Sequence, residues 1–131
     1  MIYNITDYLE STSLKYPDKT AVCDETDSIT YSALKHTSIR IGSALNSLGI
    51  LQSEPVGIFI KKSVDAVLSV FGIAYSGGLY SYFNDELPDK RLVDMQSVLN
   101  CRFIITNKEL YERATLIFKN AAVLDISELK Q

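Results

Sequence analysis

The sequence predicts an α/β fold, a layered sheet of mostly parallel strands with flanking helices. Short apolar runs of strand length alternate along the chain with helical patterns of about a dozen residues, as in parallel crossover units. The chain has 131 residues, 47% hydrophobic and 22% charged, which is enough for one core without disulfides or metal. No repeat or linker divides the sequence. Residues 1–131 are therefore predicted to form a single α/β unit.

The N-terminal part is predicted to hold a helix followed by two short strands. Residues 5–16 form the helix, with Asn4 as its N-cap and Pro17 after its end. Residues 19–25 and 28–31 read as strands joined by a turn. The inward stripe of the helix is predicted to be Ile5, Leu9, Thr12 and Tyr16.

The clearest helix covers residues 30–49. Apolar and small residues recur on one face at spacings of four and three. Thr30 is the expected N-cap, and Gly49 suits a left-handed ending followed by Ile50. The predicted inward face consists of Leu34, Ser38, Ile41, Leu45 and Leu48.

The middle of the chain reads as strand, helix and strand. Residues 55–60 are a continuous apolar run, which is typical of a strand buried on both faces. Ser63 caps a helix that is apolar around most of its circumference and ends at Gly77 and Gly78. Residues 79–83 are extended.

The C-terminal part continues the alternation. Pro88 suits the first turn of a helix that buries Leu92, Met95 and Leu99 and closes at Asn100. A strand at 102–106, a helix at 108–119 and a last strand at 121–126 follow.

Charge and cysteine usage exclude several classes of function. Thirteen basic and 16 acidic residues are mixed along the chain, so no basic stripe supports nucleic-acid binding. Cys23 and Cys101 stand far apart, with a single histidine in the chain, which is too few ligands for zinc. Both are predicted to be small buried residues. No segment resembles a signal peptide or a membrane span, which predicts a cytoplasmic protein without a membrane partner.

Five segments occur in an order that resembles one family. They are "KYPDKTAV" (15–22), "ITYSAL" (29–34), "ALNSLGI" (44–50), "GIAYSGGLY" (72–80) and "RFIIT" (102–106). The series is similar to the N-terminal portion of the adenylate-forming ligase superfamily, which includes nonribosomal peptide synthetase adenylation domains, acyl-CoA synthetases and luciferases. Members read like "YPDKIAV", "LTYxEL", "LxxLGV", "KAGGAYVPLDPxLPxERL" and "VLIT". The positions that carry the resemblance, all with structural roles, are Thr30, Tyr31, Leu34, Gly49, Gly77, Gly78 and Tyr80.

The resemblance implies a function for a larger protein. Such an enzyme uses ATP with Mg²⁺ to activate a carboxylate as an acyl-adenylate and passes it to the thiol of coenzyme A or of a carrier-protein pantetheine. The family's Ser/Thr/Gly-rich phosphate loop, resembling "SGTTGxPKG", lies downstream of the matched region and does not occur here. The expected partner is thus the remainder of the enzyme, or a separate chain that carries it. This chain alone is expected to lack activity and to hold no cofactor.

Four places depart from the family pattern, and one of them is residues 52–58, "QSEPVGI", where many members have "KKGDRVAI". Ala33 stands where the family has the Glu of "TYxEL", so the capping-box partner of Thr30 is missing. Tyr75 replaces a lysine before the glycines, and residues 80–85 read "YSYFND" in place of "YVPLDP".

No catalytic or metal-binding residue is predicted within the chain. Gly77 and Gly78 close a helix and precede a strand, whereas a phosphate cradle opens onto a helix N-terminus. His36 is expected on the exposed side of its helix. The acidic group of Asp85, Glu86 and Asp89 suits the start of the next helix, where carboxylates favour the helix dipole.

Two alternatives accompany the adenylate-forming hypothesis. A naturally separate half would expose an apolar patch at residues 79–83 or on the helix after Ser63, where its partner binds. A flavodoxin-like binding domain would need a phosphate loop or acidic pocket after its first strand. That position, "AVCDETDS", instead continues into a second strand.

Overall fold

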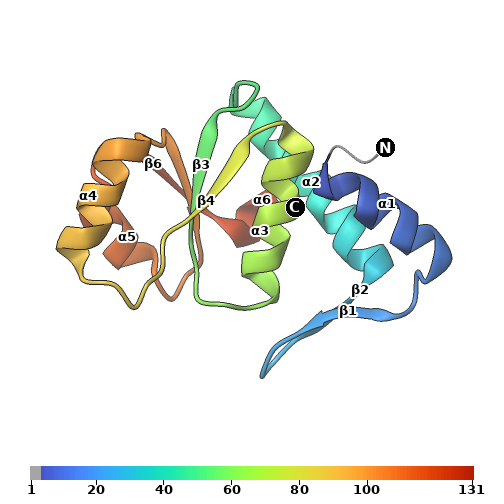
Figure 1. Ribbon diagram of the computed structural model, residues 1–131. Coiled ribbons are helices and arrows are strands. Elements are labelled where there is room, and N and C mark those ends of the chain that lie inside the picture. The colour runs from blue at the N-terminus through green and yellow to red at the C-terminus, as the bar shows by residue number, and fades with distance from the viewer. Residues whose placement is uncertain (1–3) are drawn as a thin grey trace.

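A computed structural model describes residues 4–131. Met1 to Tyr3, which the predicted unit includes, lie outside the described part. This part of the chain contains six helices and six strands, which alternate from α2 onward (Figure 1). The strands form two separate sheets, an antiparallel hairpin near the N-terminus and a four-stranded parallel sheet. The predicted α/β fold class, with mostly parallel strands and flanking helices, is confirmed.

The N-terminal elements are a helix, the hairpin and a second helix. α1 (Ile5–Lys15) precedes β1 (Thr20–Cys23) and β2 (Ser28–Thr30), which pair antiparallel. α2 (Tyr31–Ser47) follows without a break. Asn4 caps α1 and Thr30 caps α2, each accepting a backbone N–H as predicted.

The parallel sheet has the strand order β4-β3-β5-β6. It consists of β3 (Pro55–Phe59), β4 (Leu79–Tyr82), β5 (Phe103–Thr106) and β6 (Ala122–Asp125). The helices between and after these strands are α3 (Val64–Ser76), α4 (Asp89–Leu99), α5 (Tyr111–Ile117) and α6 (Ile126–Leu129).

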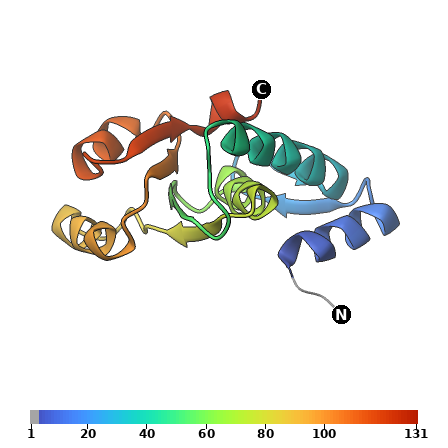
Figure 2. The same cartoon turned by 90° about the horizontal axis from the view of Figure 1, so that it is seen from above.

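The parallel sheet separates two hydrophobic cores. Val56 and Ile58 of β3 pack with α2, α3 and α6, whereas Phe59 packs on the other face with α4 and α5. Figure 2 shows the two helix groups on opposite sides of the strands. Residues on a strand alternate between faces, so this continuous apolar run is buried on both sides, as predicted.

Two predicted inward faces are wrong at their ends. Tyr16 is 55% exposed because α1 stops at Lys15 and Tyr16 leaves helical geometry. Leu9 is buried and Ile5 and Thr12 are half-buried as part of the predicted stripe, and Ser13, which was not predicted, is buried as well. On α2, Leu34, Ser38, Ile41 and Leu45 are buried as predicted. Leu48 is 46% exposed because the chain turns there.

Cys23 is exposed, contrary to the prediction of two buried cysteines. The hairpin is a two-stranded sheet that extends away from the helices (Figure 1), so part of it has no cover. Cys101 is buried as expected, and this burial raises the pKa of its thiol to about 11.

The last two elements also differ from the predicted ranges. Residues 108–110 form a turn before α5, because the Asn107 side chain accepts the Leu110 N–H at 3.2 Å. Ile126 begins α6 and does not extend the last strand. Asp125 accepts the Ser127 N–H at 3.0 Å and caps this helix, and the pattern Asp125-x-x-Glu128 was the sequence signal for it.

Candidate functional site

The carboxyl ends of the parallel strands form the first candidate site. The chain runs from β3 to β4 and then returns to β5 on the other side of β3, which makes the boundary of β3 and β5 a topological switch point. Ligands of open α/β sheets bind at such carboxyl ends. The hollow at this edge lies at the carboxyl ends of β3 and β4, on the other side of β3 from β5. Its volume is about 350 Å³, and it is lined by Lys61, Lys62, Tyr82, Asn84, Asp85 and Glu86.

The groups around this hollow are held mostly by residues outside its lining. Lys61 forms an ion pair with Glu109 at 3.0 Å, which links the loops after β3 and β5. The Tyr82 hydroxyl donates to the Ile60 carbonyl at 2.7 Å, and burial raises the pKa of this phenol. Within the described residues, no three His, Cys, Asp or Glu side chains gather closely enough to hold a metal ion. The lining of the hollow therefore supplies charged and hydrogen-bonding side chains that are suited to positioning a ligand.

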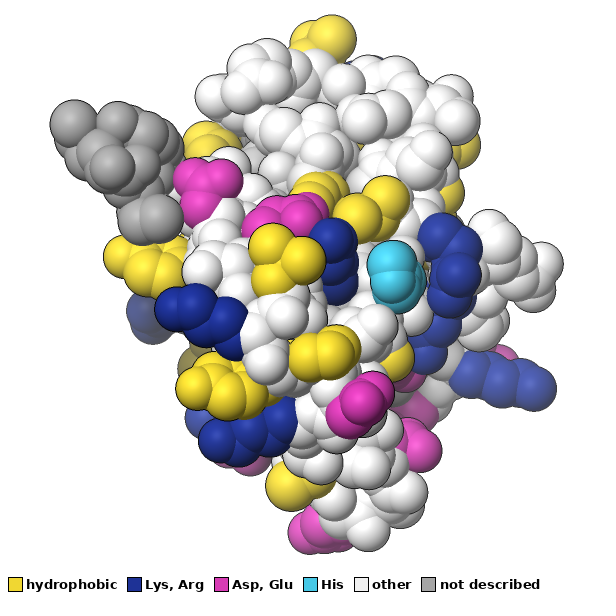
Figure 3. Space-filling view, turned by 90° about the vertical axis from the view of Figure 1, so that its right-hand side faces the viewer, with side chains coloured by type: hydrophobic (Ala, Val, Ile, Leu, Met, Phe, Trp, Pro, Cys, Tyr) yellow, Lys and Arg dark blue, Asp and Glu magenta, His cyan; other side chains and the backbone are white. Residues whose placement is uncertain are grey.

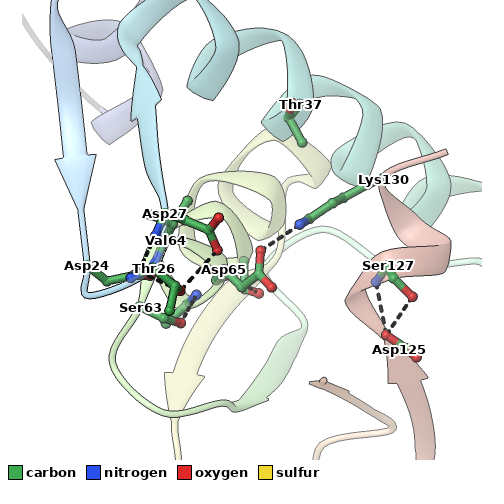
Figure 4. A network of polar contacts seen from close by, with 12 residues as sticks. Asp24, Thr26, Asp27, Thr37, Ser63, Val64, Asp65, Asp125, Ser127 and Lys130 are labelled. Atoms are coloured by element: carbon green, nitrogen blue, oxygen red, sulfur yellow. Dashed lines mark hydrogen bonds and ion pairs between the residues drawn. The ribbon is translucent and has the colours of Figure 1, made fainter. Parts of the chain in front are cut away.

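The start of α3 is occupied by a carboxylate from the hairpin. Figure 4 shows the turn between β1 and β2 beside this helix end, where the Val64 N–H donates to Asp24 Oδ2 at 2.9 Å. Ser63 supplies the N-cap from within the segment, accepting the Ala66 N–H. A phosphate bound at this helix N-terminus would need the position that Asp24 holds. The residues present thus do not fit a nucleotide phosphate here.

Hydrogen bonds hold Asp24 strongly in its charged form. The N–H groups of Val64, Thr26 and Asp27 lower the pKa of the Asp24 carboxyl to about 2. Because this pKa lies below the ordinary value of 3.8, the stability that the carboxylate contributes is complete above that value and is lost as the pH falls toward 2. Asp24→Asn should lower the urea midpoint at about pH 6, and its difference from the wild type should shrink between about pH 4 and pH 2.

Asp94→Asn, at an exposed position of α4, is the matched control for this pH series. Urea unfolding followed by circular dichroism at each pH measures both variants. A wild-type advantage over Asp24→Asn that stays constant down to pH 2 would contradict the role of the Asp24 carboxylate.

The glycine pair after α3 is a helix ending. The Gly77 N–H donates to the Ala74 carbonyl at 3.1 Å, and the Gly78 N–H donates to the Ile73 carbonyl at 3.2 Å. This is the Schellman pattern, and Gly77 has the left-handed φ of 88° that it requires. Leu79 then enters β4. The glycines therefore reverse the chain, as predicted, and do not open onto a helix.

The structure places the seven resemblance-bearing positions in three places that make no common site. Three glycines lie at the amino end of the parallel sheet, where Arg102 joins the Glu54 carboxylate at 2.6 and 2.7 Å and the Gly49 carbonyl at 3.0 Å. The others lie at the start of α2 or on β4. They are the cap Thr30, half-buried Tyr31, buried Leu34 and half-exposed Tyr80.

The isolated candidates for catalysis do not gather into a site. His36 is exposed as predicted. Asp89 lies in the first turn of α4 and pairs with Arg113 at 2.8 Å. Asp85 and Glu86 line the hollow, and the Arg113 guanidinium binds the Asp85 carbonyl at 2.7 Å.

Sequence reasoning missed the polar contacts that shape this edge. Lys61, Lys62 and Asn84 directly follow predicted strands, so the carboxyl-end rule could have found them. Arg113 and Asp24 carried no such signal, because their partners lie 24 and 40 residues away in the sequence.

Comparison with known proteins places this architecture in a family. Residues 9–130 match the family described as AMP-binding enzyme. The chain belongs to this family. Tyrocidine synthase 3 of Brevibacillus parabrevis is 29% identical over 101 residues, which are 77% of this chain and 2% of that protein. Indigoidine synthase of Dickeya dadantii is 30% identical over 105 residues, which are 80% of this chain and 7% of that protein. The chain thus spans a small part of the length of these relatives.

Solved structures agree with the family assignment. A benzoate CoA ligase from Burkholderia xenovorans LB400 is 25% identical with a TM-score of 0.87, and the match covers 98% of this chain and 28% of that one. The Klebsiella oxytoca NpsA N-terminal subdomain has a TM-score of 0.84 at 18% identity and shares the fold over 100% of this chain and 32% of its own. The fold is that of a part of the N-terminal subdomain of adenylate-forming enzymes, and membership of this family replaces the flavodoxin-like alternative.

Among residues 4–131, no helix is both long and apolar enough to cross a membrane.

Proposed function

We propose that this chain is the scaffold part of an ATP-dependent enzyme that activates a carboxylate. A carboxylate oxygen would attack the α-phosphorus of MgATP, and pyrophosphate would leave with the cleaved P–O bond. A thiol of coenzyme A or of a pantetheine carrier would then attack the acyl carbon, and AMP would leave. The observation that carries the proposal is the match of residues 9–130 to the AMP-binding enzyme family.

Within that enzyme, the chain would support the reaction without performing it. The start of α3 is filled by Asp24, and the sequence lacks the family's phosphate loop. Stabilising charge on a transferring phosphoryl group requires such a loop or comparable cationic donors. The remainder of the unit, in the same polypeptide or in a partner chain, would supply these groups. Residues 1–131 would act as one folded unit within the assembly.

Pyrophosphate exchange into ATP tests the proposal. The 131-residue chain and the assembled unit, in which the remainder is present, are each incubated with MgATP, labelled pyrophosphate and a panel of amino and aryl acids. We expect exchange with at least one acid in the assembled unit and none in the chain alone. Addition of coenzyme A or a pantetheine-bearing carrier should then release AMP.

Two results would contradict the proposal. Exchange by the 131-residue chain alone would show that it contains the catalytic groups. An assembled unit that binds no ATP and exchanges no pyrophosphate with any acid of the panel would remove the proposed reaction.

A further inference from the structure

Strand β4 leaves one edge of the parallel sheet open. The Leu79 N–H donates to the Glu54 carbonyl at 2.8 Å, and the Phe83 N–H donates to the Ile58 carbonyl at 2.9 Å. Backbone groups in a parallel strand alternate in direction, so those of the residues between, Tyr80 and Tyr82, point away from β3. No other described strand pairs with β4. Two N–H and two C=O groups are therefore available in line.

This edge lacks the features that usually prevent strand addition. Edge strands are commonly protected by charged residues, proline or a bulge. Residues 79–83 contain neither charge nor proline, and the register of β4 with β3 is regular from Pro55 to Ile58. The opposite edge strand, β6, ends in the charged residue Asp125. The β4 edge is suited to a partner strand.

Apolar side chains continue this open edge on both sides. Leu79 is 55% and Tyr80 49% exposed. Leu51 is 66% exposed on the adjacent loop, where its carbonyl accepts the Glu54 N–H. On the side of α3 between α1 and β4, Figure 2 shows no described helix or strand as cover. Half-buried Val67, Val70 and Ala74 form an i, i+3, i+7 stripe on α3.

The end of the molecule that carries α1 has a different character. Figure 3 shows lysine, arginine and acidic side chains between the hydrophobic ones on that face. Such a mixed surface is normal for solvent-exposed regions, and single apolar residues there need no partner. The edge at β4 differs from this face because residues 79–83 carry no charge and because the strand has unpaired backbone groups.

We propose that the open edge of β4 receives a β-strand from the remainder of the adenylate-forming unit, whose connecting segment covers the α3 stripe. The inference rests on the proposed function. The chain spans 32% of the NpsA N-terminal subdomain, so a unit of that size has about twice this length of further polypeptide to place against it. An added strand would satisfy the outward groups of Tyr80 and Tyr82 and cover Leu79.

Amide hydrogen exchange, resolved by residue, tests this assignment in the chain and in the assembled unit. The Tyr80 and Tyr82 amides should exchange rapidly in the 131-residue chain and at least about 100-fold more slowly in the assembled unit. The Ile58 amide, on the central strand, should be protected in both. Equal exchange of Tyr80 and Tyr82 in the two samples would overturn the proposal. Protection in the isolated chain that rises with its concentration would also overturn it, because a second copy would then occupy the edge.

A charged substitution at the edge provides a second measurement. Tyr80→Lys should leave the thermal midpoint of the isolated chain within about 1 °C and lower that of the assembled unit by about 5 °C. Val98→Lys is the matched control, since Val98 is 83% exposed on α4, and it should change neither midpoint. An equal decrease of the thermal midpoint in both samples would show that Tyr80 only stabilises the fold of the chain itself. An unchanged midpoint in the assembled unit would exclude a strand at this edge.

The two proposals fail in different ways. An assembled unit that exchanges pyrophosphate while its Tyr80 amide stays unprotected retains the function and loses the strand-addition site. Protection of Tyr80 in a unit that forms no adenylate retains the site and overturns the function.

Discussion

Gly72→Val should destabilise the chain by about 3 kcal/mol, which corresponds to roughly 10 °C in the thermal midpoint. Gly72 is buried on α3 against α2, and a β-carbon there would lie 2.7 Å from the Cβ of Ile41. At Gly42 on α2, a β-carbon would lie 2.8 Å from the Cβ of Tyr75. The two helices thus approach through glycine, and valine would have to separate them.

Valine has a better helix propensity than glycine by roughly 0.4 kcal/mol, so the packing effect should dominate. Ser43→Val, at an exposed position of the same α2, is the control and should be nearly neutral. Urea unfolding of both variants gives the comparison. A Gly72→Val protein as stable as the wild type would show that α2 and α3 can separate without loss.

A double-mutant cycle locates the effect in the contact itself. Ile41→Ala removes Cγ2, which is the atom nearest to the new β-carbon, and keeps Cβ. Its own cost is about 2–5 kcal/mol for a fully buried side chain. Gly72→Ala should therefore be less destabilising in the Ile41→Ala background than in the wild type. Equal costs in the two backgrounds would place the strain elsewhere.

Arg113→Ala should destabilise the chain by about 2–3 kcal/mol and loosen the connection between β4 and α4. The guanidinium donates to the Asp85 carbonyl at 2.7 Å, to the Leu87 carbonyl at 3.0 Å and to the Asp89 carboxylate at 3.0 Å. It also lies 5.3 Å from the centre of the Phe59 ring. Hydrogen bonds to charged groups each contribute about 1.5–3 kcal/mol, and the partial exposure of the side chain reduces their sum.

Arg113→Lys separates geometry from charge. A lysine ammonium keeps the positive charge but lacks the planar fork that reaches three acceptors, so most of the stability should still be lost. Arg91→Ala, at an exposed position of α4, is the control and should be nearly neutral. Urea midpoints and amide exchange of residues 84–89 measure the outcome. A lysine variant as stable as the wild type would reduce the role of Arg113 to its charge.

The Arg113 contacts also bear on the candidate site. Asp85 and Glu86 line the hollow at the carboxyl end of the sheet, and Arg113 holds the backbone on both sides of Glu86. The acidic group that the sequence predicts at a helix start is therefore held in place by a residue from α5. Asp89 combines the predicted dipole interaction with an ion pair.

The alternating pattern of apolar runs was sufficient to predict the order and type of nearly every element. Capping residues such as Thr30, Ser63 and Gly77 also marked helix ends correctly, because the hydrogen bonds that end a helix lie within a few residues. Family membership, too, could be inferred from five ordered segments. Each of these features depends on residues that are close together in the sequence, so the sequence alone is enough to identify it.

Tertiary structure alone decided which of these elements meet. Asp24 binds the start of α3, and Arg113 binds the connection between β4 and α4. In both cases the partners lie 24 or more positions apart in the sequence, where a short-range pattern carries no information about them. The exposure of Cys23 was mispredicted for the same reason, since burial depends on which neighbours cover a residue. Tyr16 and Leu48 were mispredicted because their helices end before them. Likewise, the residues of β4 were predicted to be extended, but the open edge appeared only once the strand order placed β4 outermost, because pairing partners are set by the packing of the whole sheet.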